Sequence, residues 1–128
     1  MLFRSKARQV LGPLTDVDLS ASSFPFMAFR EGRVANIPAR IFRVSFSGDL
    51  SYEINVPARH GLALWQALME SGRPHGITPY GTEALHILRA EKGYIVVGHE
   101  TDGTITPHDL GYGGMVSKKK DFLGRRSL

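Results

Sequence analysis

The sequence predicts an α+β fold: an antiparallel-rich sheet with helices packed on one side of it. Two observations carry this prediction. Residues 42–46 and 52–56 alternate apolar and polar side chains on either side of a loop rich in Gly, Asp and Ser, which is typical of a β hairpin. Residues 58–71 and 82–91 carry apolar side chains at helical spacing, and a glycine follows each segment. The chain has 128 residues, of which 42% are hydrophobic and 22% charged, as expected of one globular domain.

The segment before the hairpin predicts a short helix and a first strand. Ser5 is expected to cap the helix, and Gly12 followed by proline ends it. Residues 26–31 predict a strand, and Gly32 with Arg33 is expected to turn the chain. Pro38 suits the beginning or edge of the next strand. The buried side chains of the first helix are expected to be Ala7, Val10 and Leu11.

The two longer helices have predicted inner faces and predicted ends. In the helix over residues 58–71, Gly72 is expected to supply a left-handed stop before Pro74. Gly93 is expected to cap the helix over residues 82–91. The predicted inner faces are Leu62, Trp65, Leu68 and Met69 in the earlier helix, and Ala84, Leu85 and Leu88 in the later one.

The last third of the chain predicts short elements only. Residues 94–97 are expected to be extended, and Thr106 is expected to cap a helix of about one turn with Pro107 at its first position. Asp121 is expected to cap a last helix, which the end of the chain at Leu128 cuts short. The chain is therefore predicted to be a single domain, residues 1–128, cut from a larger protein. A further strand is expected at Tyr112, Met115 and Val116.

Composition excludes several classes of site and protein. The chain has no cysteine, so disulfides and thiolate metal sites are excluded. Its five histidines show no H-x-x-x-H pair, and no G-x-G-x-x-G motif follows a strand, so neither a metal site nor a dinucleotide fold is predicted. No apolar run is long enough for a membrane span or a signal peptide, and a cytoplasmic location is expected. The net charge of +4 is concentrated in residues 118–128, which indicates a solvated tail and not a nucleic-acid surface.

The order of motifs along the chain resembles a known family. The hairpin, the Trp65 helix, residues 75–93, residues 98–104 and the stretch closing at Arg126 together resemble the folate-binding domain of the glycine-cleavage T-protein (aminomethyltransferase) family. Within that family they look most like the C-terminal region of sarcosine oxidase alpha subunits. The resemblance implies a piece of a T-protein-like domain, with flavin and dinucleotide domains upstream and a β-barrel downstream lying outside this chain.

The resemblance also implies a function. In this family tetrahydrofolate receives a one-carbon unit released from a methylamine. In sarcosine oxidase a flavin first oxidises sarcosine, and the carbon then reaches folate to give 5,10-methylenetetrahydrofolate. Flavin and NAD are expected in other domains or subunits, and the other sarcosine oxidase subunits are the expected partners, with no nucleic acid and no membrane. The chain alone is expected to be inactive and to self-associate through the apolar face that truncation leaves exposed.

The resemblance assigns four binding residues, and neither a catalytic residue nor a metal ligand. Phe46 would pack on the pterin ring, Glu53 would accept hydrogen bonds from its N–H edge, and Gly48 would allow close approach of the backbone. His99 would lie in a loop beside the folate channel. The chain departs from the family at Leu85, where T-proteins have the arginine that binds the folate tail. From the residues alone, Glu53 also fits a solvated side chain on the outer face of a sheet, and His99 fits a surface loop.

Three other functions remain open. The chain fits a non-catalytic folate-domain protein less well, because those relatives carry K-G-C-Y where this sequence has Lys92, Gly93, Tyr94 and Ile95. It also fits a subunit-interaction module that binds no ligand. An aminomethyltransferase or a dimethylglycine dehydrogenase-like folate domain is the third alternative.

Overall fold

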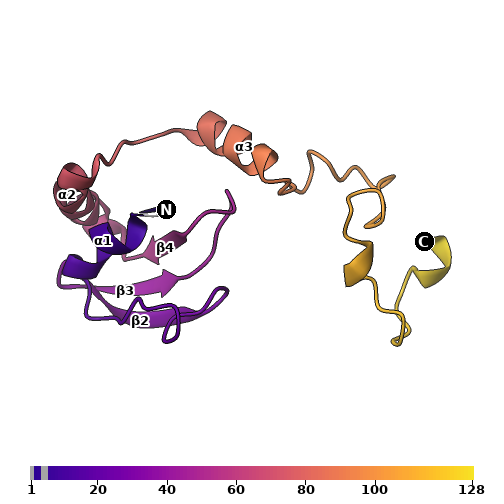
Figure 1. The fold of residues 1–128 in the computed structure, drawn as a ribbon, viewed down its shortest axis with the longest axis horizontal. Coiled ribbons are helices and arrows are strands. Elements are labelled where there is room, and N and C mark those ends of the chain that lie inside the picture. Colours follow the sequence, from indigo (N-terminus) through magenta and orange to yellow (C-terminus); the bar gives the residue numbers. More distant parts are fainter. Residues whose placement is uncertain (1, 4–5) are drawn as a thin grey trace. The chain divides into compact units, whose positions relative to one another are not determined.

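The structure, a computed structural model, describes residues 2–3 and 6–128. The chain divides into two compact units, Met1–Tyr94 and Ile95–Leu128 (Figure 1). The first unit contains every long helix and strand of the described residues, and the second consists of turns and single 3₁₀ turns. We describe each unit by itself.

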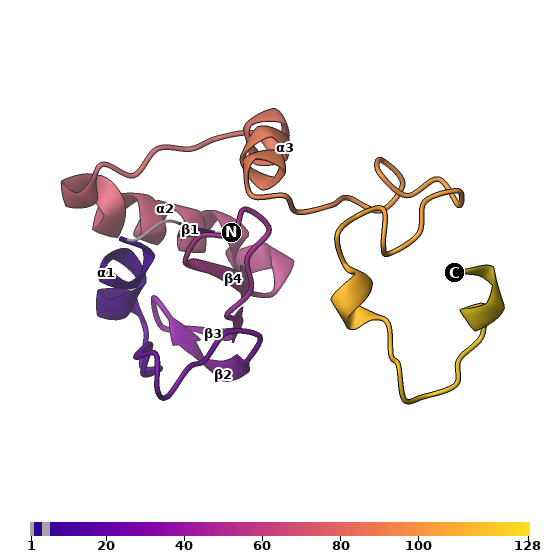
Figure 2. The same ribbon diagram turned by 45° about the vertical axis from the view of Figure 1, so that its right-hand side comes forward.

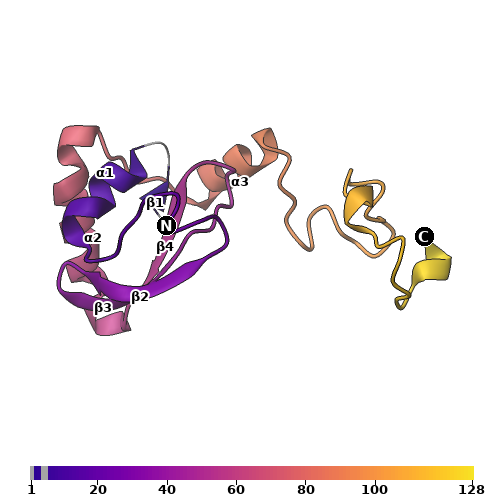
Figure 3. The ribbon, with the colours of Figure 1, turned by 60° about the horizontal axis from the view of Figure 1, so that its bottom comes forward.

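The first unit is an antiparallel sheet of four strands in the order β1-β4-β3-β2, confirming the predicted α+β class. Helices α1 and α2 pack against each other on one side of the sheet (Figures 2 and 3). The strands are β1 (Leu2–Phe3), β2 (Phe29–Val34), β3 (Ile37–Phe42) and β4 (Ser51–Asn55). The α-helices are α1 (Ala7–Leu11), α2 (Gly61–Gly72) and α3 (Thr82–Glu91), and the 3₁₀ helices are η1 (Gly12–Leu14), η2 (Ala58–His60) and η3 (Arg73–His75).

The core lies between the inner face of the sheet and the first two helices. Its inner sheet residues alternate along β3, where Ile37, Ala39 and Ile41 are buried. The predicted buried face of α1 is confirmed, and its predicted cap, Ser5, lies outside the described residues. The core consists of Ala7, Val10, Leu11, Leu19, Phe24, Val34, Ile37, Ala39, Ile41, Tyr52 and Leu64.

The first hairpin turns three residues later than predicted. Ala35 and Asn36 both have positive φ, 50° and 62°, as a two-residue type I′ turn requires. Gly32, the expected turn residue, lies inside β2 opposite Ala39, so the predicted turn and the strand over residues 26–31 were wrong in register. Val34 and Ile37 decide the register, because this turn buries both side chains.

The buried face of α2 also differs from the prediction. Leu62 and Trp65 are 70% and 51% exposed, whereas Leu64 is buried and Leu68 is half-buried. Ser71, on the same face as these two leucines, donates from Oγ to the backbone oxygen of Val10 in α1 at 2.7 Å. The i, i+4, i+7 row that meets α1 is therefore inside, and the prediction of an inner face through Trp65 was wrong.

Helix α2 ends at Gly72, as predicted, but the left-handed conformation expected of this glycine lies elsewhere. Gly72 keeps helical φ, and the left-handed residue is Gly76, with φ of 74°, after the turn η3. Gly72 has a different reason to be glycine: a Cβ there would come within 2.6 Å of the side chain of Ile77. Glycine is therefore needed at position 72 for close packing against Ile77 and not for a positive φ.

Helix α3 has the predicted bounds and the predicted C-cap. Gly93 has φ of 73°, and its N–H donates to the oxygen of Ala90 at 3.0 Å. The N–H of Tyr94 donates to the oxygen of Arg89 at 2.9 Å. These two bonds form a Schellman motif, which fixes the end of the helix.

The second unit contains two 3₁₀ turns, η4 (Gly113–Met115) and η5 (Arg125–Ser127), and one isolated bridge between Val97 and Thr101. The strand predicted at residues 112, 115 and 116 is absent, and η4 lies there instead. Residues 94–97 belong to no strand apart from the bridge at Val97, because this unit offers no ladder of partners for them. The predicted helix at Thr106 is a single hydrogen-bonded turn. The last predicted helix is only η5, with Asp121 paired to Arg125 at 3.8 Å. Among the described residues no helix has the length and apolar character that a bilayer crossing requires.

Candidate functional site

The candidate site is built on the face of the sheet that points away from the core. Phe29, Phe42 and Glu53 are paired across β2, β3 and β4, and side chains of paired residues project from the same face. The rings of Phe29 and Phe42 stack with centroids 5.6 Å apart and planes at 26°. Glu53 is exposed, as its predicted phase in the strand requires. Oε1 of Glu53 accepts a hydrogen bond from Nδ2 of Asn55 at 3.1 Å.

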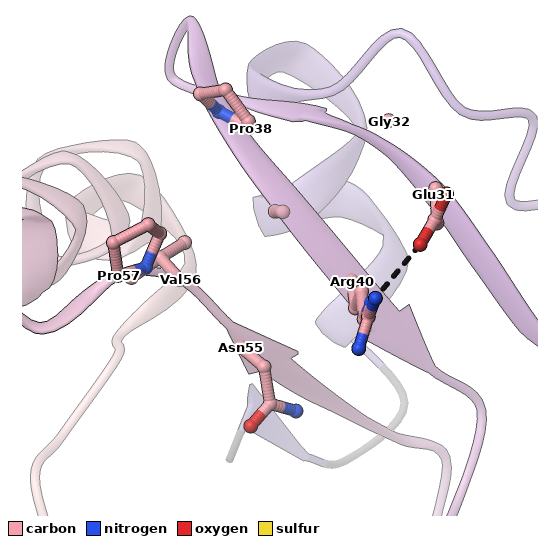
Figure 4. A pocket seen from close by; sticks show the side chains of 8 residues that line it. Glu31, Gly32, Pro38, Arg40, Asn55, Val56 and Pro57 are labelled. Carbon is pink, nitrogen blue, oxygen red and sulfur yellow. Dashed lines mark hydrogen bonds and ion pairs between the residues drawn. The ribbon is translucent and has the colours of Figure 1, made fainter.

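A second row of polar side chains lies one step along the strands. Glu31, Arg40 and Asn55 are paired across the same three strands (Figure 4). Nε of Arg40 donates to Oε1 of Glu31 at 3.0 Å, and both side chains are about two-thirds exposed. A shallow hollow of about 410 Å³ runs over this row, lined also by Gly32, Pro38, Ala39, Val56 and Pro57. We call these two rows, Phe29, Glu31, Arg40, Phe42, Glu53 and Asn55, the outer sheet face.

Residues 43–50 connect β3 to β4 and carry two of the predicted site residues; we call them the site loop. Strand β3 ends at Phe42, so the prediction of a strand continuing to Phe46 was wrong. The backbone of Arg43 still exchanges hydrogen bonds with Met27 and Ala28 at 2.9 Å, but the chain then leaves the sheet. Phe46 is half-buried in the loop.

Gly48 makes the close approach that its sequence position suggested, and the group it approaches is a side chain of this protein. Its φ is 79°, a conformation that favours glycine. A Cβ at Gly48 would lie 2.9 Å from Cγ of Lys92, the residue that follows α3. Nζ of Lys92 lies 3.7 Å from Oδ1 of Asp49, so the site loop also has an ion pair with this lysine.

The four predicted site residues fall in different units. Phe46, Gly48 and Glu53 belong to the first unit, and His99 belongs to the second. His99 is exposed, and its N–H donates to the oxygen of Val96 at 3.0 Å within a turn. Among the described residues no three His, Cys, Asp or Glu side chains gather in a way that suits a metal ion.

Sequence reasoning missed Phe42 and Asn55 as neighbours of Glu53, and Phe29 as the stacking partner of Phe42. It expected the aromatic partner of Glu53 to be Phe46, at the edge of the loop. The residue directly across from Glu53 is Phe42, because the loop is longer than the alternation suggested. A signal existed in the serines at 45 and 47, since such residues favour loops over strand interiors.

The fold and the outer sheet face define an α+β domain with an open sheet face that carries aromatic, carboxylate and guanidinium groups. Residues 5–120 match the family described as the GCVT N-terminal domain, and the chain belongs to this family. The resemblance stated from the sequence motifs is thereby confirmed.

Named relatives give the family match more detail. The chain is 51% identical over 125 residues to the sarcosine oxidase subunit alpha of Corynebacterium sp. (strain U-96), covering 96% of this chain and 13% of that protein. It is 39% identical over 121 residues to the aminomethyltransferase of Streptomyces avermitilis, covering 93% and 32%. It is 35% identical over 125 residues to human mitochondrial dimethylglycine dehydrogenase, covering 96% and 14%. The chain thus spans a small part of each of these relatives.

Proposed function

We propose that the outer sheet face and the site loop form part of a tetrahydrofolate site in a sarcosine-oxidising enzyme. The observation that carries the proposal is Glu53: an exposed carboxylate directly across from Phe42, whose ring stacks on that of Phe29. The relatives named sarcosine oxidase subunit alpha and aminomethyltransferase support the reaction class.

The residues present fit a flat heterocycle with an N–H edge. A carboxylate only accepts hydrogen bonds when ionised, and its two oxygens match two neighbouring N–H groups in one plane. Asn55 holds Oε1 of Glu53 at 3.1 Å, so the carboxylate keeps one orientation and its second oxygen remains available to a ligand. Phe42, and Phe46 in the site loop, would supply apolar surface for the ring. When bound, tetrahydrofolate would accept the one-carbon unit.

The proposal for the whole enzyme extends beyond this chain. We propose that flavin and NAD bind in other domains or subunits, and that other sarcosine oxidase subunits are its partners. His99 is proposed to lie beside the folate, in the second unit. The relative named dimethylglycine dehydrogenase supports dimethylglycine as an alternative amine substrate of the whole enzyme. Because the chain has no G-x-G-x-x-G motif, we expect no peroxide production from sarcosine when the 128-residue chain is assayed alone.

Glu53→Gln tests the proposal, because glutamine keeps the shape of the side chain and removes its charge. Titration of the 128-residue chain with 5-formyltetrahydrofolate, followed by calorimetry, measures the affinity. A hydrogen bond to a charged group contributes about 1.5–3 kcal/mol, so we expect the affinity to fall roughly ten- to a hundredfold.

Glu70→Gln is the matched control. Glu70 is an exposed glutamate on α2 that pairs with Arg73, and it lies outside the outer sheet face. Its replacement should leave the affinity unchanged, and circular dichroism should show that both variants are folded. Wild-type affinity in Glu53→Gln would contradict the assignment and leave Glu53 as a solvated side chain.

A further inference from the structure

The site loop is only weakly held by its own hydrogen bonds. Oγ of Ser51 donates to Oγ of Ser45 at 3.4 Å and approaches the oxygen of Asp49 at 3.3 Å. Nη1 of Arg43 reaches the oxygen of Ser51 at 3.4 Å. All three distances are at the long end for hydrogen bonds. The buried hydroxyl of Ser47 has no partner among the described residues, so the interior of the loop adds little further order.

Lys92 provides a contact from outside the loop. Its Cγ and Cδ would be 2.9 Å and 3.2 Å from a Cβ at Gly48, which means that the aliphatic stem lies directly on the Gly48 backbone. Its Nζ is 3.7 Å from Oδ1 of Asp49. The Schellman motif at Gly93 fixes the backbone beside Lys92, so the stem projects from an ordered helix end.

We infer that Lys92 is a positioning residue, which holds the site loop in the conformation that presents Phe46. The inference rests on the proposed function, since Phe46 matters only if the loop contributes to the ligand site. Lys92 itself is assigned no contact with the ligand. The contact it makes through Gly48 also explains why glycine is required there in addition to its positive φ.

The aliphatic stem and the charge of Lys92 contribute different amounts to the stability of the site-loop conformation. The side chains of Lys92 and Asp49 are 50% and 36% exposed, and exposed ion pairs shift a conformational equilibrium by at most about fivefold. Long side chains also stabilise structure through their methylene groups, independently of charge. A substitution that removes only the charge of Lys92 should therefore leave most of its stabilisation of the site loop in place.

Amide hydrogen exchange of the ligand-free 128-residue chain tests the inference directly. In Lys92→Ala we expect the amides of residues 46–50 to exchange about three- to tenfold faster, because local opening becomes easier. Lys92→Met keeps most of the stem and should change exchange less than threefold, and Lys92→Arg should restore the wild-type rates. The amides of Gly32 and Ala39, in the β2–β3 ladder, should not change. Lys118→Ala, at an exposed lysine of the second unit, is the control.

A double-mutant cycle with Gly48 tests the steric contact. Gly48→Ala carries strain from its positive φ in any background, but its clash with Cγ of Lys92 disappears in Lys92→Ala. The increase in loop exchange caused by Gly48→Ala should therefore be smaller in the Lys92→Ala background than in wild type. If the two substitutions increased loop exchange additively, the steric contact between Gly48 and Lys92 would be contradicted.

Titration with 5-formyltetrahydrofolate separates this inference from the proposed function. We expect the affinity of Lys92→Ala to fall by the same factor by which loop opening rises. A loss of affinity with unchanged exchange would mean that Lys92 touches the ligand, which overturns the positioning role. Unchanged exchange in Lys92→Ala overturns the inference whatever the folate result. Absence of folate binding by wild type would instead contradict the proposed function, and the exchange rates would still decide on Lys92.

Discussion

Each of the two units is stabilised internally by a different kind of interaction. Every residue of the buried apolar core belongs to the first unit, between Ala7 and Leu64. In the second unit, Val97, Met115 and Leu123 are 84%, 81% and 103% exposed. Its apolar side chains line an open hollow of about 310 Å³ and do not close into a core. Burial stabilises the first unit, and the second unit lacks this contribution.

Three side-chain hydrogen bonds in the second unit join residues that are close in the sequence. Oγ1 of Thr104 donates to Asp102 at 2.7 Å, Oγ1 of Thr106 donates to Asp109 at 2.7 Å, and the N–H of Lys120 donates to Ser117 at 2.9 Å. Each bond closes a turn of three or four residues. The first unit has contacts such as the bond from Ser71 to Val10, which joins α2 to α1. We therefore expect the turns of the second unit to define a backbone path without adding cooperative stability.

The largest expected effect comes from truncating a core side chain in the first unit. Ile41 is fully buried in β3, so Ile41→Ala should lower the free energy of unfolding by about 2–5 kcal/mol. The matched change in the second unit, Ile105→Ala, removes the same atoms from a side chain that is 40% exposed. Ile105→Ala should change the free energy of unfolding by less than about 0.5 kcal/mol. Urea denaturation followed by circular dichroism measures both, and equal losses would show that Ile105 is packed as tightly as Ile41.

A smaller effect is expected from adding one methyl group to a glycine. A Cβ at Gly32 would meet the side chain of Val17 and lie 2.7 Å from Oδ1 of Asp16. This carboxylate oxygen also accepts the N–H of Arg33 at 2.7 Å, so it cannot move away without losing that bond. Gly32→Ala should therefore lower the free energy of unfolding by about 1–3 kcal/mol.

Gly114 provides the control for Gly32 in the second unit. It has no positive φ, and nothing lies within 4 Å of an added Cβ. Gly114→Ala should leave the free energy of unfolding within about 0.5 kcal/mol of wild type in the same urea titration. A loss as large as that of Gly32→Ala would show packing around Gly114 that the structure lacks.

The same difference explains which elements the sequence could predict. Helix α3 was predicted with its bounds because Gly93 gives a local signal that needs no tertiary contact. The inner face of α2 was not predicted correctly, because Leu62 and Trp65 fit helical spacing as well as Leu64 and Leu68 do. Contact with α1 decides which pair is buried. In the second unit the cap at Thr106 was predicted, but no packing extends its single turn into a helix.

The candidate site was predictable in part for the same reason. The exposure of Glu53 followed from its phase in the strand. Its neighbour Phe42 did not, because the register of β3 against β4 depends on the length of the site loop. The contact between Gly48 and Lys92 joins residues far apart in the sequence, and no local pattern encodes it.

The smallest expected effect concerns the turns themselves, which both units contain. Hydrogen bonds from the side chain and the backbone N–H of Thr106 lower the pKa of Asp109 below its ordinary value, and His108 lowers it further. In the first unit, hydrogen bonds from Ser23 and Ser20 lower the pKa of Asp18. A carboxylate with a lowered pKa stabilises its turn at pH values above the unfolded pKa of about 3.9, and this contribution is lost as the pH falls through the lowered pKa.

A titration of the Asp109 and Asp18 carboxyl carbons, followed by NMR, tests whether the turn of the second unit forms without a core. Thr106→Val keeps the shape of the side chain but removes the hydroxyl, so the pKa of Asp109 should rise toward its ordinary value while that of Asp18 stays lowered. If Asp109 already had an ordinary pKa in wild type and Asp18 did not, hydrogen bonds alone would be insufficient to hold such turns. The order in the first unit would then depend on its core even at the exposed turn around Asp18, where no apolar side chain is involved in the bond.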